Sequence, residues 1–254
     1  MSVALNGKKI LITREEDQAF EFSDKVTKYG GEPVSVPLLK ISCSDIPGNK
    51  EIFPSEEPFK WIFFTSSNGV KCFFSFIDKY HLSRYLENCR FAVTGRKTAQ
   101  SLATFGYKAD LVPEVYNAET LAKEFLDLKG RKEPVLLVRG NKSRMVLPNK
   151  FKEHGISFRT IEVYETSFNK SATEDLNRLL QKDDIDFLTF TSPSAVEAYH
   201  QMVIPHSGET PVVVCIGTTT EQRAIELGLE KIITPDDFTI DGMLKEISDF
   251  IEKG

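Results

Sequence analysis

Short apolar runs alternate with longer, more polar segments along the chain. Six of these runs show no sustained alternation of apolar and polar positions, which is typical of strands buried on both faces of a parallel sheet. The runs are 9–13, 61–65, 91–94, 135–138, 187–191 and 212–216. The segments between them have the length of helices, and four end at a glycine, which readily takes the left-handed conformation that terminates a helix. These glycines are Gly30, Gly106, Gly155 and Gly228. The pattern predicts an α/β fold with helices on both sides of parallel sheets.

The chain contains an internal repeat, with two copies of one sequence unit. Arg14 and Arg139 are 125 positions apart, and Gly95 and Gly217 are 122 positions apart. The matching segments are 10–37 with 135–162, 61–74 with 187–200, and 91–125 with 213–247. Two copies are too few for a solenoid, so the repeat predicts two similar domains.

Two extended runs, 32–44 and 157–168, follow the first helix of each copy. Each could span about 40 Å at roughly 3.3 Å per residue, about twice the length of a typical strand. We therefore expect both runs to cross between the domains as a two-stranded β linker, near 36–40 and 162–168. The first domain is then discontinuous, 1–36 plus 169–254, and the second is 39–165. Each is expected to be a doubly wound, flavodoxin-like parallel sheet.

Small hydroxyl residues follow the predicted strands, at the edge where open parallel sheets bind ligands. Backbone N–H groups and the positive end of a helix favour anions there, although helix capping alone explains any single loop. Four such loops, gathered by two domains at one cleft, favour an anion site. The candidate binding residues are Arg14, Thr65, Ser66, Ser67, Thr98, Arg139, Gly140, Thr191, Ser192, Gly217 and Thr220. Lys97, Lys142 and Arg144 are further cations in or beside these loops, with solvated surface charge as the alternative for each.

Tyr164 lies in the second predicted crossover, which would place it beside the cleft. A phenol there could donate a proton or a hydrogen bond to a leaving oxygen. A packed hinge aromatic explains the residue equally well.

Several function classes are excluded by the sequence. No GxxxxGK[ST], GxGxxG or GxSxG motif follows a predicted strand, which argues against an NTPase, a dinucleotide enzyme or a serine hydrolase. Cys43, Cys72, Cys89 and Cys215 lie far apart, so we expect buried free thiols and no metal site. The net charge of −5 argues against nucleic acid. Apolar stretches are too short for a membrane span or a signal peptide, so we expect a cytoplasmic protein.

The sequence resembles the uroporphyrinogen-III synthase family over essentially its whole length. The resemblance rests on ILITR, VPLLKI, FFTSSNGV, VTGRKTAQSL, IEVYET, LTFTSPSAV and IGTTTEQRAIELGL in this order. It implies a lyase without metal or other cofactor, with two similar α/β domains and an active site in the cleft. Such an enzyme closes the linear tetrapyrrole hydroxymethylbilane into uroporphyrinogen III, with loss of water and inversion of the last ring.

The resemblance also assigns roles to residues. Tyr164 matches a tyrosine that assists departure of the terminal hydroxyl, and Thr98 and Thr220 match threonines of the cleft. Thr65, Ser66, Thr191 and Ser192 match positions that line it. Glu221 departs from the family pattern, because alanine usually follows the threonine there. We expect a monomer, with a transient hand-over of substrate from hydroxymethylbilane synthase; a non-catalytic anion-binding or sensor protein is the alternative.

Overall fold

A computed structural model describes residues 3–53, 59–128, 133–182, 184–205, 208 and 210–253. Contacts within the chain divide it into two compact units. The first unit is Met1–Lys40 with Ser167–Gly254, and the second is Ile41–Thr166. Residues 37–40 and 167–168, which we expected to be linkers, group with the first unit. The predicted domain ranges also include 1–2, 54–58, 129–132, 183, 206–207, 209 and 254, which lie outside the described residues.

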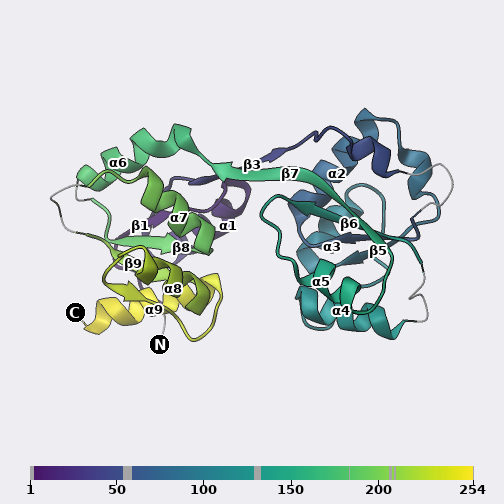
Figure 1. The fold of residues 1–254 in the computed structure, drawn as a ribbon. Helices are drawn as coiled ribbons and strands as arrows, with labels where there is room; N and C mark the ends of the chain where they lie inside the picture. Colours follow the sequence, from purple (N-terminus) through teal and green to yellow (C-terminus); the bar gives the residue numbers. More distant parts are fainter. Residues whose placement is uncertain are drawn as a thin grey trace. The chain divides into compact units, whose positions relative to one another are not determined.

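The first unit contains a five-stranded parallel sheet in the order β10-β9-β8-β1-β2 (Figure 1). Its strands are β1 (Lys9–Ile12), β2 (Glu32–Ser35), β8 (Phe187–Phe190), β9 (Val212–Cys215) and β10 (Ile232–Ile233). Its helices are α1 (Glu16–Lys28), α6 (Thr173–Gln181), α7 (Pro193–Met202), α8 (Thr218–Glu226) and α9 (Ile240–Lys253), with a 3₁₀ turn η3 (Lys170–Ala172).

Helices cover both faces of this sheet, and β1 shows why its sequence is a continuous apolar run. Successive side chains of a strand point to opposite faces. Ile10 packs with Phe22 of α1 and Leu244 of α9, whereas Leu11 packs in a second cluster with Val196 of α7. All five side chains are buried.

The second unit contains a five-stranded sheet in the order β3-β7-β6-β4-β5. Its strands are β3 (Leu39–Cys43), β4 (Trp61–Phe64), β5 (Arg90–Val93), β6 (Val135–Gly140) and β7 (Phe158–Phe168). Its helices are α2 (Ser67–Lys79), α3 (Arg96–Ala103), α4 (Ala118–Asp127) and α5 (Val146–Glu153), with 3₁₀ turns η1 (Asn49–Ile52) and η2 (Ser83–Leu86). One face packs against α2 and α3, and the other packs against α4 and α5.

The strands of the two copies occupy equivalent places. The repeat matches β1, β2, β8 and β9 with β6, β7, β4 and β5, and each set is ordered in the same way in its sheet. In the place of β10, the second unit has a single parallel bridge between Ala92 and Leu111.

The predicted extended run 32–44 is divided in the structure. Residues 36–38 interrupt it, so that β2 belongs to the first sheet and β3 to the second. Pro37 lies at the break, and proline cannot donate a hydrogen bond to a strand ladder. The other run forms one long strand, β7, of 11 residues.

The second sheet is mixed, whereas we expected a wholly parallel one. The Asn169 N–H donates to the Leu38 carbonyl at 2.8 Å, and the Ser44 N–H donates to the Val163 carbonyl at 2.8 Å. Residue numbers therefore rise along one strand while they fall along its neighbour, so β3 runs antiparallel to β7. Antiparallel strands are common at the edge of an otherwise parallel sheet. In the part of the chain that is described, no helix is both long and apolar enough to cross a bilayer.

Two of the four cysteines form a disulfide, which corrects the expectation of free thiols. Cys43 at the end of β3 is bonded to Cys72 of α2, and their Cα atoms are 5.1 Å apart. Cys89 and Cys215 are free. Burial raises the pKa of the Cys89 thiol to about 11, and burial together with the nearby Glu221 carboxylate raises that of Cys215 to about 12.

We predict a stepwise pattern of alkylation. The folded protein at pH 8 should react very slowly with iodoacetamide, because a thiol of pKa about 11 is only about one-thousandth ionised there. Unfolding without a reductant should expose two reactive thiols, and reduction should expose four. Mass spectrometry of the peptides identifies the labelled residues. Labelling of Cys43 and Cys72 in the unreduced, unfolded chain would contradict the disulfide.

Candidate active site

The second unit carries a pocket of about 390 Å³ at the carboxyl edge of its sheet. Loops that follow β4, β5 and β6 form its walls, as expected for ligand sites in parallel sheets. The lining residues are Thr65, Ser66, Thr94, Tyr116, Asn117, Ala118, Glu119, Lys142, Ser143, Arg144, Val146, Leu147 and Tyr164.

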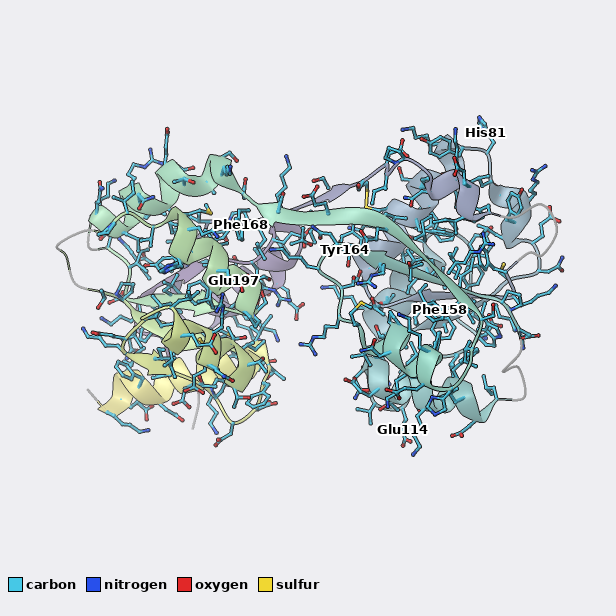
Figure 2. All side chains as sticks on the ribbon, viewed as in Figure 1. His81, Glu114, Phe158, Tyr164, Phe168 and Glu197 are labelled. Carbon is cyan, nitrogen blue, oxygen red and sulfur yellow. A yellow bond between two sulfur atoms is a disulfide. The ribbon has the colours of Figure 1, made fainter. Side chains whose placement is uncertain are left out.

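Tyr164 reaches this pocket from β7, where it lies between Phe158 and Phe168 (Figure 2). The register of β6 and β7 shifts by one residue at this point, because Arg139 is opposite Glu162 whereas Gly140 is opposite Tyr164. Such a bulge redirects the following side chain. Only 9% of the Tyr164 surface remains exposed.

Gly140 makes room for the tyrosine ring. A Cβ atom at Gly140 would lie 2.5 Å from Cζ of Tyr164 and closer still to Cε2, which real structures do not tolerate. The close approach of a backbone and a ring therefore fixes the plane of the phenol. A glycine is needed at Gly140 for this contact, and its φ is not in the left-handed region.

The Tyr164 hydroxyl lies 3.1 Å from Oγ of Ser66. Ser66 is the N-cap of α2, and its Oγ accepts a hydrogen bond from the Gly69 N–H at 3.0 Å. A serine hydroxyl has one hydrogen to donate, so the capping bond leaves that hydrogen available for the phenol oxygen. The Gly69 N–H, the Ser66 hydroxyl and the Tyr164 hydroxyl thus form one connected chain of hydrogen bonds.

The loop after β6 supplies positive charge to the pocket. Lys142 and Arg144 both line it, and Ser143 between them ties the loop back to the strand by accepting from the Gly140 N–H at 2.9 Å. Glu119 in the first turn of α4 is the acidic lining residue. Two cations beside helix N-termini suit an anionic ligand.

The other predicted residues of the second unit serve the surrounding structure. Ser67 donates to the carbonyl of Lys97 at 3.2 Å, and Thr98 is buried in α3. The Arg139 guanidinium turns back onto its own loop, where it donates to the Ser143 carbonyl at 2.9 Å. Thr65, Ser66 and Tyr164 line the pocket, whereas Ser67, Thr98, Arg139 and Gly140 do not.

In the first unit, the predicted residues lie at the starts of two helices. Ser192 is the N-cap of α7 and accepts from the Ala195 N–H at 3.3 Å, next to the half-buried Thr191. Gly217 is the N-cap of α8, and Thr220 is buried in its first turn. Arg14 follows β1, and burial lowers the pKa of its guanidinium. Through the repeat, these positions correspond to positions of the second unit: Arg14 to Arg139, Thr191 to Thr65, Ser192 to Ser66, Gly217 to Gly95 and Thr220 to Thr98.

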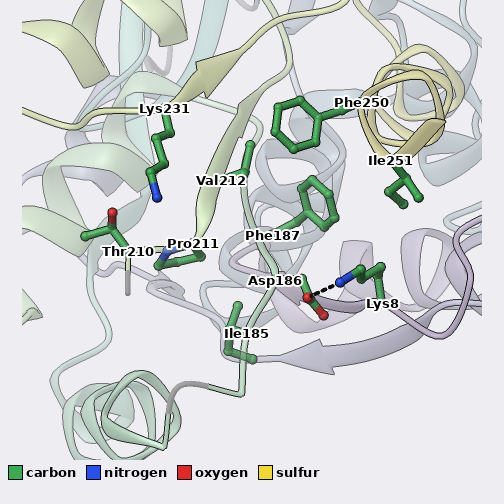
Figure 3. A pocket seen from close by; sticks show the side chains of 10 residues that line it. All are labelled: Lys8, Ile185, Asp186, Phe187, Thr210, Pro211, Val212, Lys231, Phe250 and Ile251. Atoms are coloured by element: carbon green, nitrogen blue, oxygen red, sulfur yellow. Dashed lines mark hydrogen bonds and ion pairs between the residues drawn. The ribbon is translucent and has the colours of Figure 1, made fainter. Parts of the chain in front are cut away.

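The first unit also contains a pocket of about 450 Å³, shown in Figure 3. It lies at the amino edge of the sheet, where Phe187 and Phe250 meet edge to face with ring centres 5.9 Å apart. Asp186 there accepts from Nζ of Lys8 and from the Lys9 N–H, both at 2.8 Å, so its carboxylate holds the strand ends together. Helix N-termini face the opposite edge, and none of the predicted site residues lines this pocket.

Sequence reasoning did not single out Tyr116, Asn117 or Ser143 as pocket residues. Asparagine is a preferred N-cap residue, and Asn117 does cap α4, where its Oδ1 accepts from the Thr120 N–H at 2.7 Å. The repeat offered a signal for Tyr116, since the second copy has Phe238 at the equivalent position. Over the ranges that the structure describes, no three His, Cys, Asp or Glu side chains gather closely enough to hold a metal ion.

Comparison with known proteins gives one consistent family. The family model for uroporphyrinogen-III synthase HemD matches residues 21–245. The porphyrin biosynthesis protein HemD of Ruminiclostridium josui is 27% identical over 97% of this chain, which spans about half (49%) of that relative. The uroporphyrinogen-III synthase of Chlorobaculum parvum is 26% identical over 96% of this chain and 100% of its own length.

Two solved structures share the fold. A mutant uroporphyrinogen III synthase from the extremely thermophilic bacterium Thermus thermophilus has a TM-score of 0.63 at 16% identity, covering 97% of this chain and 100% of that chain. The synthetase from Helicobacter pylori has a TM-score of 0.62 at 18% identity, covering 93% and 96%. The α/β fold is therefore the fold of these structures.

The contact between Gly140 and Tyr164 can be tested by a double-mutant cycle. Gly140→Ala should lower the free energy of unfolding by about 1–3 kcal/mol, because the added methyl group overpacks the ring. The same substitution in a Tyr164→Ala background should be nearly neutral, since the ring is gone. Urea unfolding of the four proteins measures the coupling. An equal loss in both backgrounds would show that the alanine disturbs something other than the tyrosine.

Proposed function

We propose that this chain, which belongs to the uroporphyrinogen-III synthase family, cyclises hydroxymethylbilane to uroporphyrinogen III in tetrapyrrole (haem) biosynthesis. The match over residues 21–245 supports the activity. The observation that carries the mechanism is the Tyr164 hydroxyl, held 3.1 Å from Ser66 in a pocket that also presents Lys142 and Arg144.

The reaction is a loss of water followed by ring closure. Departure of the terminal hydroxyl, with a proton, leaves a cationic azafulvene at one end of the bilane. Attack on this cation by the substituted α-carbon of the last ring gives a spiro intermediate. The bond from that carbon to the neighbouring methylene bridge then breaks, which forms a second azafulvene cation at the bridge. The free α-carbon of the same ring bonds to the bridge, so that the ring is inverted. Loss of a proton restores the aromatic pyrrole. Because the bilane also cyclises unaided to the wrong isomer, the protein's task is mainly to hold one conformation, an effect worth several kcal/mol.

Tyr164 is proposed to assist the departure of the hydroxyl. Oγ of Ser66 accepts from the Gly69 N–H, and its own hydrogen can be donated to the phenol oxygen. The phenol hydrogen is then free to point into the pocket, where it can be donated to the leaving oxygen. Polarisation along this chain of hydrogen bonds strengthens the final donor.

The substrate's eight carboxylates are proposed to engage the loops that precede the helices. In the second unit, Lys142, Arg144 and the N–H groups at the start of α2 suit them. In the first unit, we assign the same role to Arg14 and to the loops that begin α7 and α8. The buried Thr98 and Thr220 would act by shaping the first helical turn. Ser67 and Arg139 would act by holding their loops, as their hydrogen bonds within the protein indicate.

The finer architecture is part of the same proposal. The strand order of each unit favours two flavodoxin-like domains, the first discontinuous and the second continuous, linked by β3 and β7. We further propose that the protein is a cytoplasmic monomer and that it works without a cofactor. It would take its substrate from hydroxymethylbilane synthase.

The activity is tested by the isomer that the purified protein produces. Fresh hydroxymethylbilane is supplied, the products are oxidised, and uroporphyrins I and III are separated by chromatography. We expect the type III isomer to dominate, against type I in the reaction without protein. Type I alone, at the uncatalysed rate, would instead favour a non-catalytic anion-binding protein.

Tyr164→Phe separates catalysis from stability. The ring and its contact with Gly140 remain, so the free energy of unfolding should fall by only about 1 kcal/mol for the lost hydrogen bond. The rate constant kcat should fall by about 10²-fold, because the donor to the leaving oxygen is removed.

Tyr107→Phe is the matched control for this variant. The Tyr107 ring packs against Phe74 and Phe91 in the same unit and does not line the pocket. Its activity should equal that of the parent protein. If Tyr164→Phe also kept the full kcat, the tyrosine would have no role in the departure of the hydroxyl.

A further inference from the structure

Two exposed aromatic side chains occupy equivalent places in the two copies of the repeat. Tyr116 and Phe238 are 122 positions apart, the same spacing as Gly95 and Gly217. Their exposed fractions are nearly equal, at 52% and 55%. Single exposed apolar side chains are normal on a protein surface, so the informative feature is that both copies of the repeat keep one at the same position.

Each ring lies on the glycine that begins the neighbouring helix. A Cβ atom at Gly95 would be 3.2 Å from Cγ of Tyr116, and one at Gly217 would be 3.1 Å from Cγ of Phe238. Gly95 and Gly217 are the N-caps of α3 and α8. In each unit, therefore, one face of an aromatic ring packs against the backbone at the carboxyl edge of the sheet.

The backbone holds both rings in the same way. The Asn117 N–H donates to the Val115 carbonyl at 2.7 Å, and the Thr239 N–H donates to the Asp237 carbonyl at 2.7 Å. Each bond closes a three-residue turn with the aromatic residue at its centre.

The residue after each ring then caps a helix. Asn117 accepts from the Thr120 N–H at 2.7 Å, and Thr239 accepts from the Gly242 N–H at 3.0 Å. A Cβ at Gly242 would collide with the Asp237 carbonyl, so the turn rests directly on α9. Each ring is thus fixed between a turn and a cap.

Packing alone does not account for this arrangement. An apolar residue just before an N-cap often packs against the fourth helical residue, here Leu121 and Met243. Both of these are fully buried in the cores, whereas the two rings keep about half of their surface exposed. Tyr116 lines the same pocket as Tyr164, and the Arg96 guanidinium lies 5.9 Å from the Tyr116 ring centre.

We infer that Tyr116 and Phe238 are positioning residues that bind pyrrole rings of the substrate, one ring in each unit. The inference rests on the proposed function and deepens it. A tetrapyrrole chain has flat rings between its carboxylates, and flat apolar rings stack on aromatic faces. The carboxylates bind N–H groups and cations, while the aromatic faces of Tyr116 and Phe238, which we call the platforms, fix the planes of the pyrrole rings. Because each platform is fixed by its turn, little freedom is lost on binding.

The test combines kinetics and binding with Tyr116→Ala and Phe238→Ala. KM for hydroxymethylbilane should rise roughly threefold to tenfold in each variant, the range expected for one aromatic contact. The dissociation constant of uroporphyrin III, measured by equilibrium dialysis, should rise by a similar factor. Tyr116→Phe and Phe238→Tyr keep an aromatic ring, so KM and the dissociation constant should equal those of the parent protein. The melting temperature should change little, since about half of each ring is exposed.

Phe20→Ala is the matched control, because Phe20 is 80% exposed on α1 and should leave KM and the dissociation constant unchanged. If the parent protein makes the type III isomer but both alanine variants keep the parent KM and dissociation constant, the platforms are overturned and the activity stands. Lower melting temperatures with unchanged binding would show that the rings only pack. If the parent protein makes only the type I isomer, the proposed activity is wrong, and the role of the platforms is then tested by uroporphyrin binding alone. Weaker uroporphyrin binding in the alanine variants would support that role. Unchanged binding, or no binding by the parent protein, would overturn it.

Discussion

Burial of both faces of each sheet is the constraint from which the rest of the structure follows. Ile10 and Leu11 point to opposite sides of one strand, and both are fully buried. Strands covered in this way contain few polar side chains, because burying a polar group is unfavourable unless it finds a hydrogen-bond partner. Polar chemistry is therefore confined to the ends of the strands. At the carboxyl ends, helices begin and present N–H groups, and this is where the pocket with Ser66 and Tyr164 is found.

The position of the tyrosine depends on two local departures from regular structure. A bulge between β6 and β7 brings Tyr164 opposite Gly140, and the absence of a side chain at Gly140 lets the ring lie against the backbone. The phenol oxygen is then within hydrogen-bond distance of Oγ of Ser66, which is also the N-cap of α2. A capping serine is a common element of protein structure. Its contact with the tyrosine links that ordinary cap to the proposed chemistry.

The two copies have kept some features and lost others. The aromatic residues on the helix-starting glycines, Tyr116 and Phe238, are present in both. By the offset of the first matching segment, the counterpart of Tyr164 is Leu39, and the counterparts of Lys142 and Arg144 are Asp17 and Ala19. Tyr164, Lys142 and Arg144 therefore have no equivalent in the first copy, whose cation after the first strand is Arg14, the counterpart of Arg139. This asymmetry suits a substrate whose two ends differ chemically, since only one end carries the leaving hydroxyl.

The sequence by itself determined the features that depend on neighbouring residues: the buried strands, the glycines that end helices, and the hydroxyl loops with Thr65 and Ser66. These follow from periodicity and from local backbone preferences, which each short segment expresses alone. Tertiary structure decided which residues meet across the chain. It joined Cys43 to Cys72, 29 positions apart, and placed β3 antiparallel beside β7. It also set Tyr164 against its glycine, because strand register depends on packing between segments distant in sequence, which no local pattern records.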